Sequence, residues 1–446
     1  MQRQAATSKG LDRRLRDVHF ERVKDERYAP NVRHRLDTVL NMVVTAMATM
    51  ARSLRHAEQR TEQIIKKHGQ WQGLRKRIAD NTFGNVIRWA SVPSLVQRLH
   101  GLIKAEHRRG NLKPTVLRIS TAAIDGKNVA TLHWRTLCQE LELDPQVAKP
   151  KHVKRLVRKK FPNLQFCQPK DGEPYALARV HTVTLISSLA ACCIHERPIA
   201  GCTNEIGAMP ALLKELHQVY SRCGLIEMIT TDAGNTSLKT ATQTVERLRL
   251  DYFAQMKVEH GDVYAEAERV LGRRGTKQSD LYYTEPQNGK VATYHIWHED
   301  LTDEGWLNWK HARQFVRVQR VAEDPVTGDK TTGNRYYVCS KDSKRVTPEQ
   351  ALNISRAHWR CEEETHWTSD AMLLEDQRRL AWSRHPNGVF VASVLRKIAL
   401  VILAVARKLS RFGYTRETPS WRQVAEHFAL TMCATNLLTE KFDAVD

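Results

Sequence analysis

Between residues 115 and 260, short apolar runs alternate with amphipathic runs. The apolar runs have the length of strands, and the amphipathic runs repeat apolar residues every three or four positions, as helices do. Strands that alternate with helices are typical of an α/β sheet. The sequence therefore predicts the α/β class here. The predicted strands are 115–125, 129–134, 180–194, 224–233 and 251–259, and the predicted helices are 205–220 and 237–248.

Turn signals subdivide this region and the segment after it. Residues 126–128, Gly-Lys-Asn, separate two strand-like runs and predict a β hairpin there. Residues 280–347 contain further turn signals between strand-like runs, which predict β hairpins inserted into the α/β domain. Residues 149–160, KPKHVKRLVRKK, predict a basic helix or loop.

Helical patterns flank the α/β region on both sides. Apolar residues recur at helical spacing from 33 to 67, and Ser91 followed by Pro93 is a signal for the start of another helix. Residues 1–30 are polar and charged, which predicts a loose arm. The apolar run 398–406 is too short to span a bilayer, so it predicts a buried helix and no membrane partner.

The predicted organisation has five parts. A helical N-terminal region for DNA binding or dimerisation precedes a core that is split by a β-rich insertion, and a helical tail follows. The boundaries are 1–114, 115–260 for the first part of the core, 261–347 for the insertion, 348–412 for the second part of the core, and 413–446 for the tail.

The charge balance points to a polyanionic partner. The chain has 70 Lys and Arg against 49 Asp and Glu, a formal net charge of +21 spread along its whole length. Such an excess favours nucleic acid as the partner. The nine cysteines are an odd number without a C-x-x-C pair, which predicts reduced thiols in the cytoplasm.

Against this basic background, residues 354–376 gather six carboxylates. Glu362 lies in this segment on a predicted helix, while Asp125 and Asp232 each end a predicted strand. Ligands of α/β sheets bind beyond strand ends, and Mg²⁺ prefers carboxylate oxygen. Two such ions about 4 Å apart stabilise both oxygens of a phosphoryl displacement. The three carboxylates therefore predict metal-assisted chemistry on a nucleic-acid backbone.

Other interpretations of these residues stay open on pattern alone. An Asp before Gly or Ala is most often a turn residue or a helix cap, and a run of Glu usually lies on a solvated helix face. His358, Glu362 and His366 are four apart, which suggests a zinc site on one helical face, but they do not form H-E-x-x-H.

The residues around these carboxylates resemble those of a known family. RAHWRCEEETHW at 356–367 resembles the glutamate motif of bacterial insertion-sequence transposases of the DDE type, in the H-repeat-associated (ISAs-type) subgroup of the IS-four-like superfamily. AIDGK, TTDA, TNEIGAMPALLKEL and DYFAQMK match further motifs of the subgroup in order. The resemblance covers roughly residues 33–410 and selects Glu362 over Glu363 and Glu364.

The resemblance implies a ribonuclease H-like catalytic core with an inserted β-rich subdomain, preceded by a helical domain. It implies Mg²⁺ as cofactor, with Mn²⁺ able to substitute. The implied catalytic and metal-binding residues are Asp125, Asp232 and Glu362. The expected DNA contacts are Lys127, Lys257, Arg356, His358, Trp359 and His366, joined by Lys154, Arg155 and Arg158 of the basic segment; Asn204 and Glu205 are expected to support the site.

The expected function is cutting of insertion-sequence ends and transfer of the freed 3′-hydroxyl into target DNA. The expected partner is double-stranded DNA, namely terminal inverted repeats and target DNA, bound by a homodimer in the bacterial cytoplasm at the nucleoid. Two alternatives are a catalytically silent domesticated transposase that binds DNA and a standalone Mg²⁺-dependent nuclease.

Overall fold

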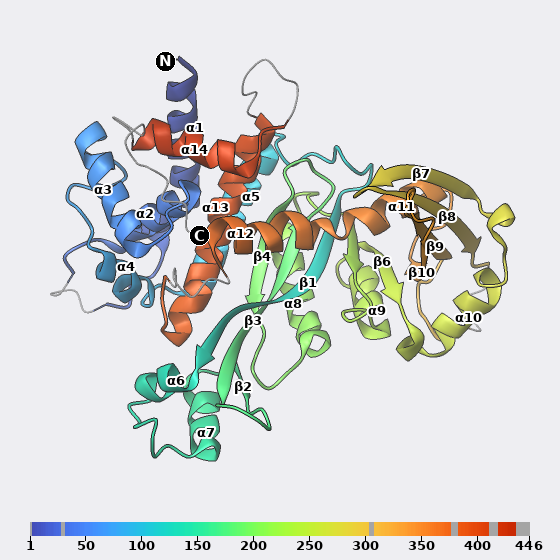
Figure 1. Cartoon of the computed structure of the whole chain (residues 1–446), viewed down its shortest axis with the longest axis horizontal. Coiled ribbons are helices and arrows are strands. Elements are labelled where there is room, and N and C mark those ends of the chain that lie inside the picture. The colour runs from blue at the N-terminus through green and yellow to red at the C-terminus, as the bar shows by residue number, and fades with distance from the viewer. Residues whose placement is uncertain (1, 28–31, 303–306, 376–381, 410–417, 434–446) are drawn as a thin grey trace.

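A single mixed β-sheet of ten strands runs through the molecule (Figure 1). The structure is a computed structural model that describes residues 2–27, 32–302, 307–375, 382–409 and 418–433. The strand order is β2-β3-β1-β5-β6-β10-β9-β8-β7, and β4 pairs with residues 180–185 of β3, beyond the stretch of β3 that pairs with β2. The strands are β1 Thr121–His133, β2 Leu164–Cys167, β3 Tyr175–Leu185, β4 Cys192–Pro198, β5 Met228–Thr231, β6 Asp251–Met256, β7 Leu281–Gln287, β8 Lys290–Asp300, β9 Gln314–Glu323 and β10 Lys330–Cys339.

Strand β1 corrects the predicted hairpin at 126–128. The strand is continuous, because Gly126 and Asn128 stay paired with His181 and Arg179 of β3. The register shifts only after Asn128, where a β-bulge takes up the extra residue. The Gly-Lys-Asn signal therefore marks an irregularity inside a strand, and Asp125 lies within the strand and does not end it.

Residues 180–194 do not form the single strand that the sequence predicts. They form the antiparallel pair β3 and β4, with Val183 opposite His195. The small residues between the strands allow the chain to reverse, and the Ser187 carbonyl there accepts backbone N–H groups from Thr115, Val116 and Leu117. The apolar character on both sides of the reversal hid the turn.

Helices cover both faces of the sheet. On one face lie α8 (Glu205–Tyr220) and α9 (Leu238–Glu246), which confirm the predicted helices. On the other face, α11 (Pro348–Ala357), the π-helix η5 (Cys361–His366) and α12 (Trp367–Leu373) cross the strands as one nearly continuous rod (Figure 1). The rod is fixed to β3 by Thr184, whose hydroxyl lies 3.3 Å from that of Thr365.

The N-terminal helices and the C-terminal helices form one body beside the sheet (Figure 1). Its core merges with that of β1, β3 and β4. The helices are α1 Gln2–Val18, η1 Phe20–Arg22, α2 Leu36–Ala48, α3 Leu54–His68, α4 Asp80–Ile87, α5 Val92–Arg108, α13 Pro386–Leu409 and α14 Trp421–Met432. Of the predicted tail 413–446, residues 413–417 and 434–446 lie outside the described residues.

One prediction for this body is wrong and two are confirmed. The predicted loose arm is ordered within its described residues 2–27, because Leu11, Leu15 and Val18 form a buried stripe along α1. The helical pattern predicted for 33–67 is confirmed and consists of two helices, α2 and α3, the second of which is capped by Ser53. Ser91 caps α5 as predicted, accepting a hydrogen bond from the Ser94 backbone N–H.

Helix α13 is long and apolar enough to cross a membrane by length and composition alone. Every residue of its most apolar 18-residue window is buried inside the protein. It packs against α2, α5 and β4, so the predicted buried helix is confirmed. Two of its buried residues, Arg396 and Lys397, are nevertheless cationic.

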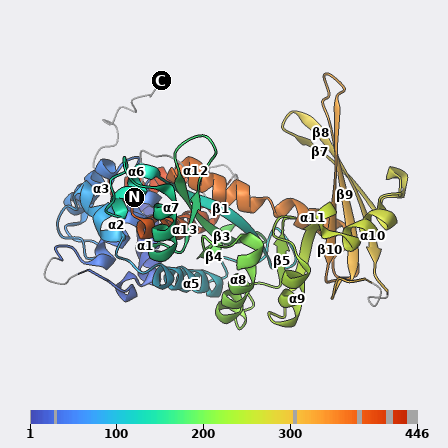
Figure 2. The ribbon, with the colours of Figure 1, turned by 90° about the horizontal axis from the view of Figure 1, so that it is seen from below.

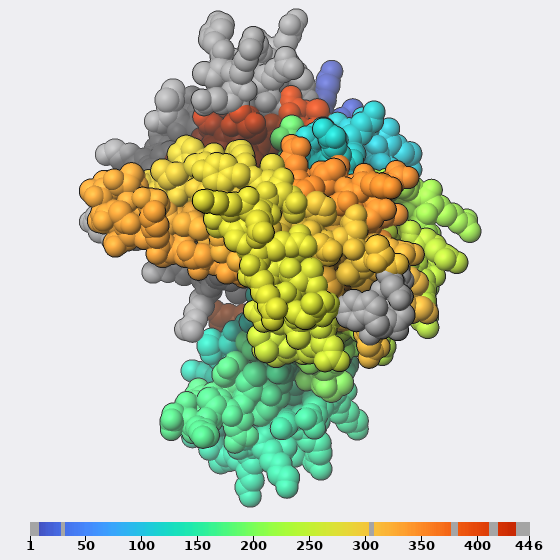
Figure 3. Space-filling model, turned by 90° about the vertical axis from the view of Figure 1, so that its right-hand side faces the viewer, coloured from blue at the N-terminus to red at the C-terminus, as the bar shows by residue number. Residues whose placement is uncertain are grey.

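Two units project from the body. The first consists of α6 (Trp134–Glu140), α7 (Pro150–Lys160) and β2, at the far end of β1 and β3 (Figure 1). The second consists of β7 to β10 with η3 (Val258–His260), α10 (Asp262–Leu271) and η4 (Thr276–Gln278), and confirms the predicted hairpins. The hairpins form a tall blade in Figure 2 and cover the front of the molecule in Figure 3. β10 pairs with β6, so the blade extends the central sheet.

Candidate active site

The pairing of β1 with β5 brings Asp125 and Asp232 together. These strands are parallel, and Ile124 is the register partner of Thr231. Asp125 and Asp232 are the next residues along each strand, so they lie side by side where β5 ends. Two acidic residues more than a hundred positions apart in sequence thus meet because of the register of one strand pair.

Asp232 is held by the turn that follows β5. Its Oδ1 accepts hydrogen bonds from the Asn235 backbone N–H at 2.9 Å and from Asn235 Nδ2 at 2.8 Å. Asn235 is fully buried. The turn geometry expected for Asp before Ala-Gly is therefore present, but it orients the carboxylate beside Asp125 and does not exclude a chemical role.

Glu362 reaches the same place from η5 on the covering rod. Cys361, Thr365 and His366 are buried against the sheet, whereas Glu362 is exposed at its edge. Although Glu362 is exposed, partial desolvation of its carboxyl and the negative charges of Asp232 and Glu363 raise its pKa. Glu364 is turned away, because Arg360 Nε donates to its Oε1 at 2.6 Å. The coupling to Asp232 agrees with the choice of Glu362 over its neighbours.

The pKa of Asp125 responds to the neighbouring carboxylates. Burial raises the pKa of Asp125 to about 7, and the negative charges of Asp232, Glu362 and Glu205 add to this rise. Carboxylates that repel one another in a partly desolvated place favour a proton or a cation there. Perturbed pKa values of this kind are typical of functional sites.

Glu205 is a fourth carboxylate at the site, and Asn204 positions it. Asn204 caps α8, accepting a hydrogen bond from the Gly207 backbone N–H at 2.8 Å. Glu205 follows as the first helical residue, with its carboxylate against Gly126, where a Cβ would clash with it. Burial and the charge of Asp232 raise the pKa of Glu205. Asn204 and Glu205, which were expected to support the site, therefore lie next to Asp125 and Asp232.

The donor chemistry of the site fits a hard divalent cation. Asp125, Asp232, Glu362 and Glu205 offer carboxylate oxygens, the ligands that Mg²⁺ prefers. Within the described part of the chain, however, no group of three or more His, Cys, Asp and Glu side chains has the spacing of a preformed metal site. The zinc interpretation gains no support, because His358 and His366 contact different strands.

His366 and His358 have protein partners in the structure. His366 Nδ1 lies 3.3 Å from Asp125 Oδ2, and its Nε2 lies 2.8 Å from Thr182 Oγ1. Burial and the charges of Lys397 and Lys127 lower the pKa of His366 to about 3. His358 is buried near Thr230, and burial lowers its pKa to about 4. The structure shows contacts of both histidines with strands of the sheet. Contacts of these histidines with DNA stay predictions.

The two lysines expected near phosphate differ in their surroundings. The Lys127 side chain is only 8% exposed, and its Nζ lies 2.6 Å from Asp370 Oδ1 and 2.8 Å from Glu375 Oε2. Lys127 is therefore a buried lysine with two carboxylate partners and does not lie on the open surface. Lys257 is half-exposed just after β6, with Nζ 3.8 Å from Glu259 Oε1.

Arg356 and Trp359 lie where the rod meets the insertion. Arg356 Nη2 donates to Glu285 Oε1 at 2.6 Å, and its guanidinium lies 5.8 Å from the ring centroid of Tyr283. Arg335 lies with its guanidinium 4.5 Å from the ring centroid of Trp359. The insertion thus contacts the rod through arginine–aromatic pairs, each worth about 0.5–2 kcal/mol.

Arg335 is the site residue that the sequence did not reveal. It lies on β10 and is exposed, and its positive charge lowers the pKa of Glu362 against the rise described above. Nothing in the sequence around Arg335 distinguishes it from other arginines of the insertion. Its place beside Glu362 depends on the pairing of β10 with β6.

The basic helix α7 lies away from this cluster on the projecting unit (Figure 1). Val153 and Val157 anchor it, which leaves Arg155 and Arg158 exposed and Lys154 half-buried. Arg155 Nη2 lies 3.1 Å from His152 Nδ1, and no acidic residue occurs in the helix. The predicted basic surface is therefore available to solvent on a helix.

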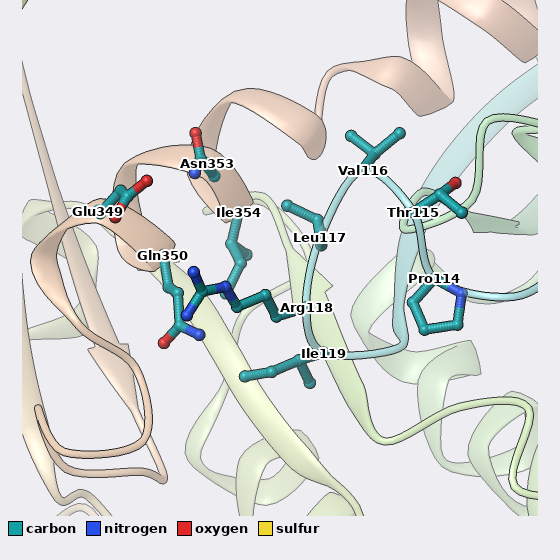
Figure 4. Close-up of a pocket in the computed structure, with 10 residues that line it drawn as sticks. All are labelled: Pro114, Thr115, Val116, Leu117, Arg118, Ile119, Glu349, Gln350, Asn353 and Ile354. Carbon is teal, nitrogen blue, oxygen red and sulfur yellow. The ribbon is translucent and has the colours of Figure 1, made fainter.

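One cavity lies apart from the carboxylates. It has a volume of about 370 Å³ between the segment 114–119 and α11. Figure 4 shows Glu349, Gln350 and Asn353 on the α11 side and Arg118 reaching toward them. None of the three predicted catalytic residues lines it, so the open acidic cluster is the better candidate site.

Comparison with known proteins agrees with the resemblance in the motifs. No family model matches the chain. Half of the chain is similar to two Escherichia coli (strain K12) proteins. The "H repeat-associated putative transposase YhhI" and the "Putative protein YbfL" are each 26% identical to this chain over 234 residues. The match covers 50% of this chain and 58% of each relative.

One solved structure also aligns with the chain. A piggyBac transposase synaptic complex with hairpin DNA, determined by cryo-EM, aligns over 95% of this chain and 76% of its own. The identity is 10% and the TM-score is 0.39, so this likeness carries no argument about the site.

Proposed function

We propose that this chain is a DNA transposase of the DDE type, with Asp125, Asp232 and Glu362 as its acidic triad. The observation that carries the proposal is the electrostatic coupling of these three residues, which come from β1, the end of β5 and η5. The similarity to a protein named as an H repeat-associated transposase supports it. The proposed chemistry is cutting of element ends, followed by attack of the freed 3′-hydroxyl on target DNA.

The strand order supports a ribonuclease H-like core. In the sequence β4-β3-β1-β5-β6, the first three strands are antiparallel, while β1, β5 and β6 are parallel. We assign β1 to β6, α8, α9 and the rod to this core, and β7 to β10 to the inserted subdomain. The insertion then enters the core between β6 and the glutamate segment.

In this proposal Asp125, Asp232 and Glu362 would hold Mg²⁺, or Mn²⁺ in its place. The cation, when bound, would stabilise charge on the attacking and leaving oxygens of the phosphodiester. The chain's own residues orient the ligands: Asn235 holds Asp232, and His366 lies against Asp125. Glu205 adds negative charge, which raises the affinity of the site for cations.

The proposed partner is double-stranded DNA, comprising element ends and target. The net charge of +21 supplies the long-range attraction. Exposed cations on α7 and at Lys257 would contact phosphate, and Arg335 and Arg356 would contact the strand near Glu362. We expect a homodimer on DNA, because two ends must be held together, acting at the nucleoid of a bacterial cytoplasm.

The test compares Asp232→Asn with the wild type. The substrate is a plasmid that carries the sequences flanking the gene, incubated with Mg²⁺. Asn keeps the size of the side chain but removes its charge, so cleavage should be lost while DNA binding persists. Asp251→Asn is the matched control, because Asp251 begins β6 at the opposite end of the strands.

Each outcome separates the proposal from its alternatives. A wild type that binds DNA but never cuts would favour a catalytically silent DNA-binding protein. Cutting without joining of the 3′-ends to a second plasmid would favour a standalone nuclease. Cleavage that survives Asp232→Asn would return Asp232 to the role of a turn residue.

A further inference from the structure

Beneath the acidic site lies a line of buried charges. Lys397 of α13 is fully buried, and its Nζ lies 3.3 Å from Glu375 Oε2. The same Glu375 oxygen lies 2.8 Å from Nζ of Lys127 on β1. We call these three residues the buried charge chain. The proposed function assigns no role to Glu375 or Lys397.

The buried charge chain has further polar neighbours. Lys397 also donates to Ser369 Oγ at 3.1 Å, and Arg396 Nη1 lies 3.6 Å from the second oxygen of Glu375. Burial alone would raise the pKa of Glu375, but the charges of Lys397, Arg396 and Lys127 outweigh it and lower the pKa to about 2. The attraction is mutual: burial alone would lower the pKa of Lys397, but negative charges, that of Glu375 foremost, raise it.

Such a cluster of buried charges contributes little net stability, because removing each charge from water costs free energy. Buried ion pairs repay their desolvation only when geometry is good, and well-packed apolar residues of similar volume often stabilise as much. Buried ionic groups are better suited to selecting one arrangement among several, because any shift leaves a charge unpaired. The buried charge chain is therefore better suited to aligning the elements that it connects than to stabilising the fold.

Its contacts connect β1 to both ends of α12. Lys127 Nζ donates to the His366 carbonyl at 3.2 Å and to Asp370 Oδ1 at 2.6 Å. Glu375 follows α12 after Leu374, whose left-handed backbone ends the helix, and the Glu375 backbone N–H donates to the Ser369 carbonyl at 3.0 Å. Lys127 thus holds the start, middle and end of the segment 366–375, while Lys397 holds its end against α13.

Two carboxylates of the acidic site lie close in sequence to residues that Lys127 connects. Asp125 is two positions before Lys127 on β1, and Glu362 precedes His366 in η5. A π-helix has looser hydrogen bonding than an α-helix and is often found at functional sites. The position of Glu362 relative to Asp125 therefore depends on how the following segment is clamped to β1.

We propose that the buried charge chain is a positioning device, in which Lys127, Glu375 and Lys397 fix the Glu362 segment against Asp125. This inference rests on the proposed function for its activity readout. It gives Lys127 an internal role in place of the contact with DNA phosphate expected from the sequence.

The first test distinguishes positioning from DNA contact. Lys127→Met should leave the dissociation constant for plasmid DNA and its salt dependence unchanged, and lower the Mg²⁺-dependent cleavage rate about 10- to 100-fold, as loss of outer-shell partners typically does. Lys257→Met is the comparison, since a lysine that contacts phosphate should shallow the salt slope by about one. A shallower slope for Lys127→Met, with normal cleavage at saturating DNA, would overturn the proposal.

The second test separates positioning from mere stability. The double variant Glu375→Gln with Lys397→Met removes one charge of each sign, so its melting temperature should stay near that of the wild type. Cleavage should still fall about 10-fold or more, because Lys127 loses its second partner. Hydrogen exchange of the amides in 361–373 should speed up without any metal or DNA present. Glu106→Gln, which disrupts the buried pair with Arg14 in the helical body, is the matched control.

The hydrogen-exchange readout does not depend on the proposed function, whereas the cleavage readouts do. If the wild type never cuts DNA, the proposed function fails, and the exchange measurement still tests the clamp. If the wild type cuts and the double variant matches it in cleavage and in exchange, the buried charge chain only stabilises the fold. Lys127→Arg, which keeps the charge, should retain more cleavage than Lys127→Met.

Discussion

His366 Nδ1 lies 3.3 Å from Asp125 Oδ2, and this contact joins the glutamate-bearing rod to the central strand of the sheet. The other ring nitrogen is 2.8 Å from Thr182 Oγ1 on β3. The His366 side chain is only 11% exposed, so both contacts are largely shielded from solvent. His366 is therefore placed to orient the carboxylate of Asp125, as outer-shell groups commonly orient metal ligands.

The first prediction concerns this contact. His366→Ala should lower the rate of Mg²⁺-dependent DNA cleavage about 10- to 100-fold. His366→Asn, which keeps a polar group on the side toward Asp125, should retain more of the rate. The dissociation constant for DNA, measured by gel shift, should be the same in both variants. A loss of DNA affinity equal to the loss of rate would instead place His366 in contact with DNA.

The second prediction concerns salt. DNA affinity of the wild type should fall about 10³-fold between 50 and 200 mM salt if about six phosphate contacts form. Replacement of Lys154, Arg155, Arg158 and Lys159 by Gln should shallow the slope of affinity against salt, because all four lie on α7. A control that exchanges Lys for Arg at 154 and 159 keeps the charge and should keep the slope. An unchanged slope in the Gln variant would exclude α7 from the DNA interface.

The third prediction concerns Arg335. Arg335→Gln removes the cation over Trp359 and the positive charge near Glu362, so the cleavage rate should fall by a factor of about 2 to 30, matching a loss of about 0.5–2 kcal/mol. Arg335→Lys keeps the charge but stacks less well on the indole, so its cleavage rate should lie between those of the wild type and Arg335→Gln. Equal rates for Gln and Lys would show that the charge itself is unimportant.

The fourth prediction concerns two buried carboxylates whose pKa values move in opposite directions. The pKa of Glu375 is lowered from 4.5 to about 2, so its contribution to stability is present above pH 4.5 and is lost as pH falls toward 2. Burial raises the pKa of Glu196 from 4.5 to about 7, so its contribution is complete below pH 4.5 and is lost as pH rises through 7.

Thermal unfolding at several pH values tests both signs. Glu375→Gln should be more destabilising at pH 7 than at pH 3, by up to about 3–5 kcal/mol at neutral pH, because it leaves buried cations with fewer partners. Glu196→Gln should be stabilising relative to the wild type at pH 8 and less so at pH 5. The same pH trend in both variants would contradict the opposite shifts.

Much of the local structure followed from the sequence. The helix 205–220, the buried helix at 398–406, the cap at Ser91 and the strand leading to Asp232 depend on periodicity and capping, which neighbouring residues express by themselves. The choice of Asp125, Asp232 and Glu362 came from the motifs around them, and their mutual charge coupling agrees with that choice. Catalysis by them stays a prediction.

The errors arose where local signals have two meanings. Gly126 to Asn128 carry the residues of a turn, yet pairing with β3 holds them in a strand. The apolar run 180–194 contains a chain reversal that small residues permit without Gly or Pro. Leu11, Leu15 and Val18 are too sparse among charges to predict order, and α1 is packed because α5, α13 and α14 cover its buried stripe.

By itself, the sequence determined the class of the elements, the excess of positive charge and the identity of the acidic residues. Only the tertiary structure decided which residues meet. The register of β1 on β5 sets Asp125 beside Asp232, and the pairing of β10 with β6 brings Arg335 to Glu362. Lys127 was expected near phosphate and is instead paired with Glu375 and Asp370. The physical reason is that periodicity and capping act between neighbours in the chain, whereas strand register and charge pairing join residues that the chain separates widely.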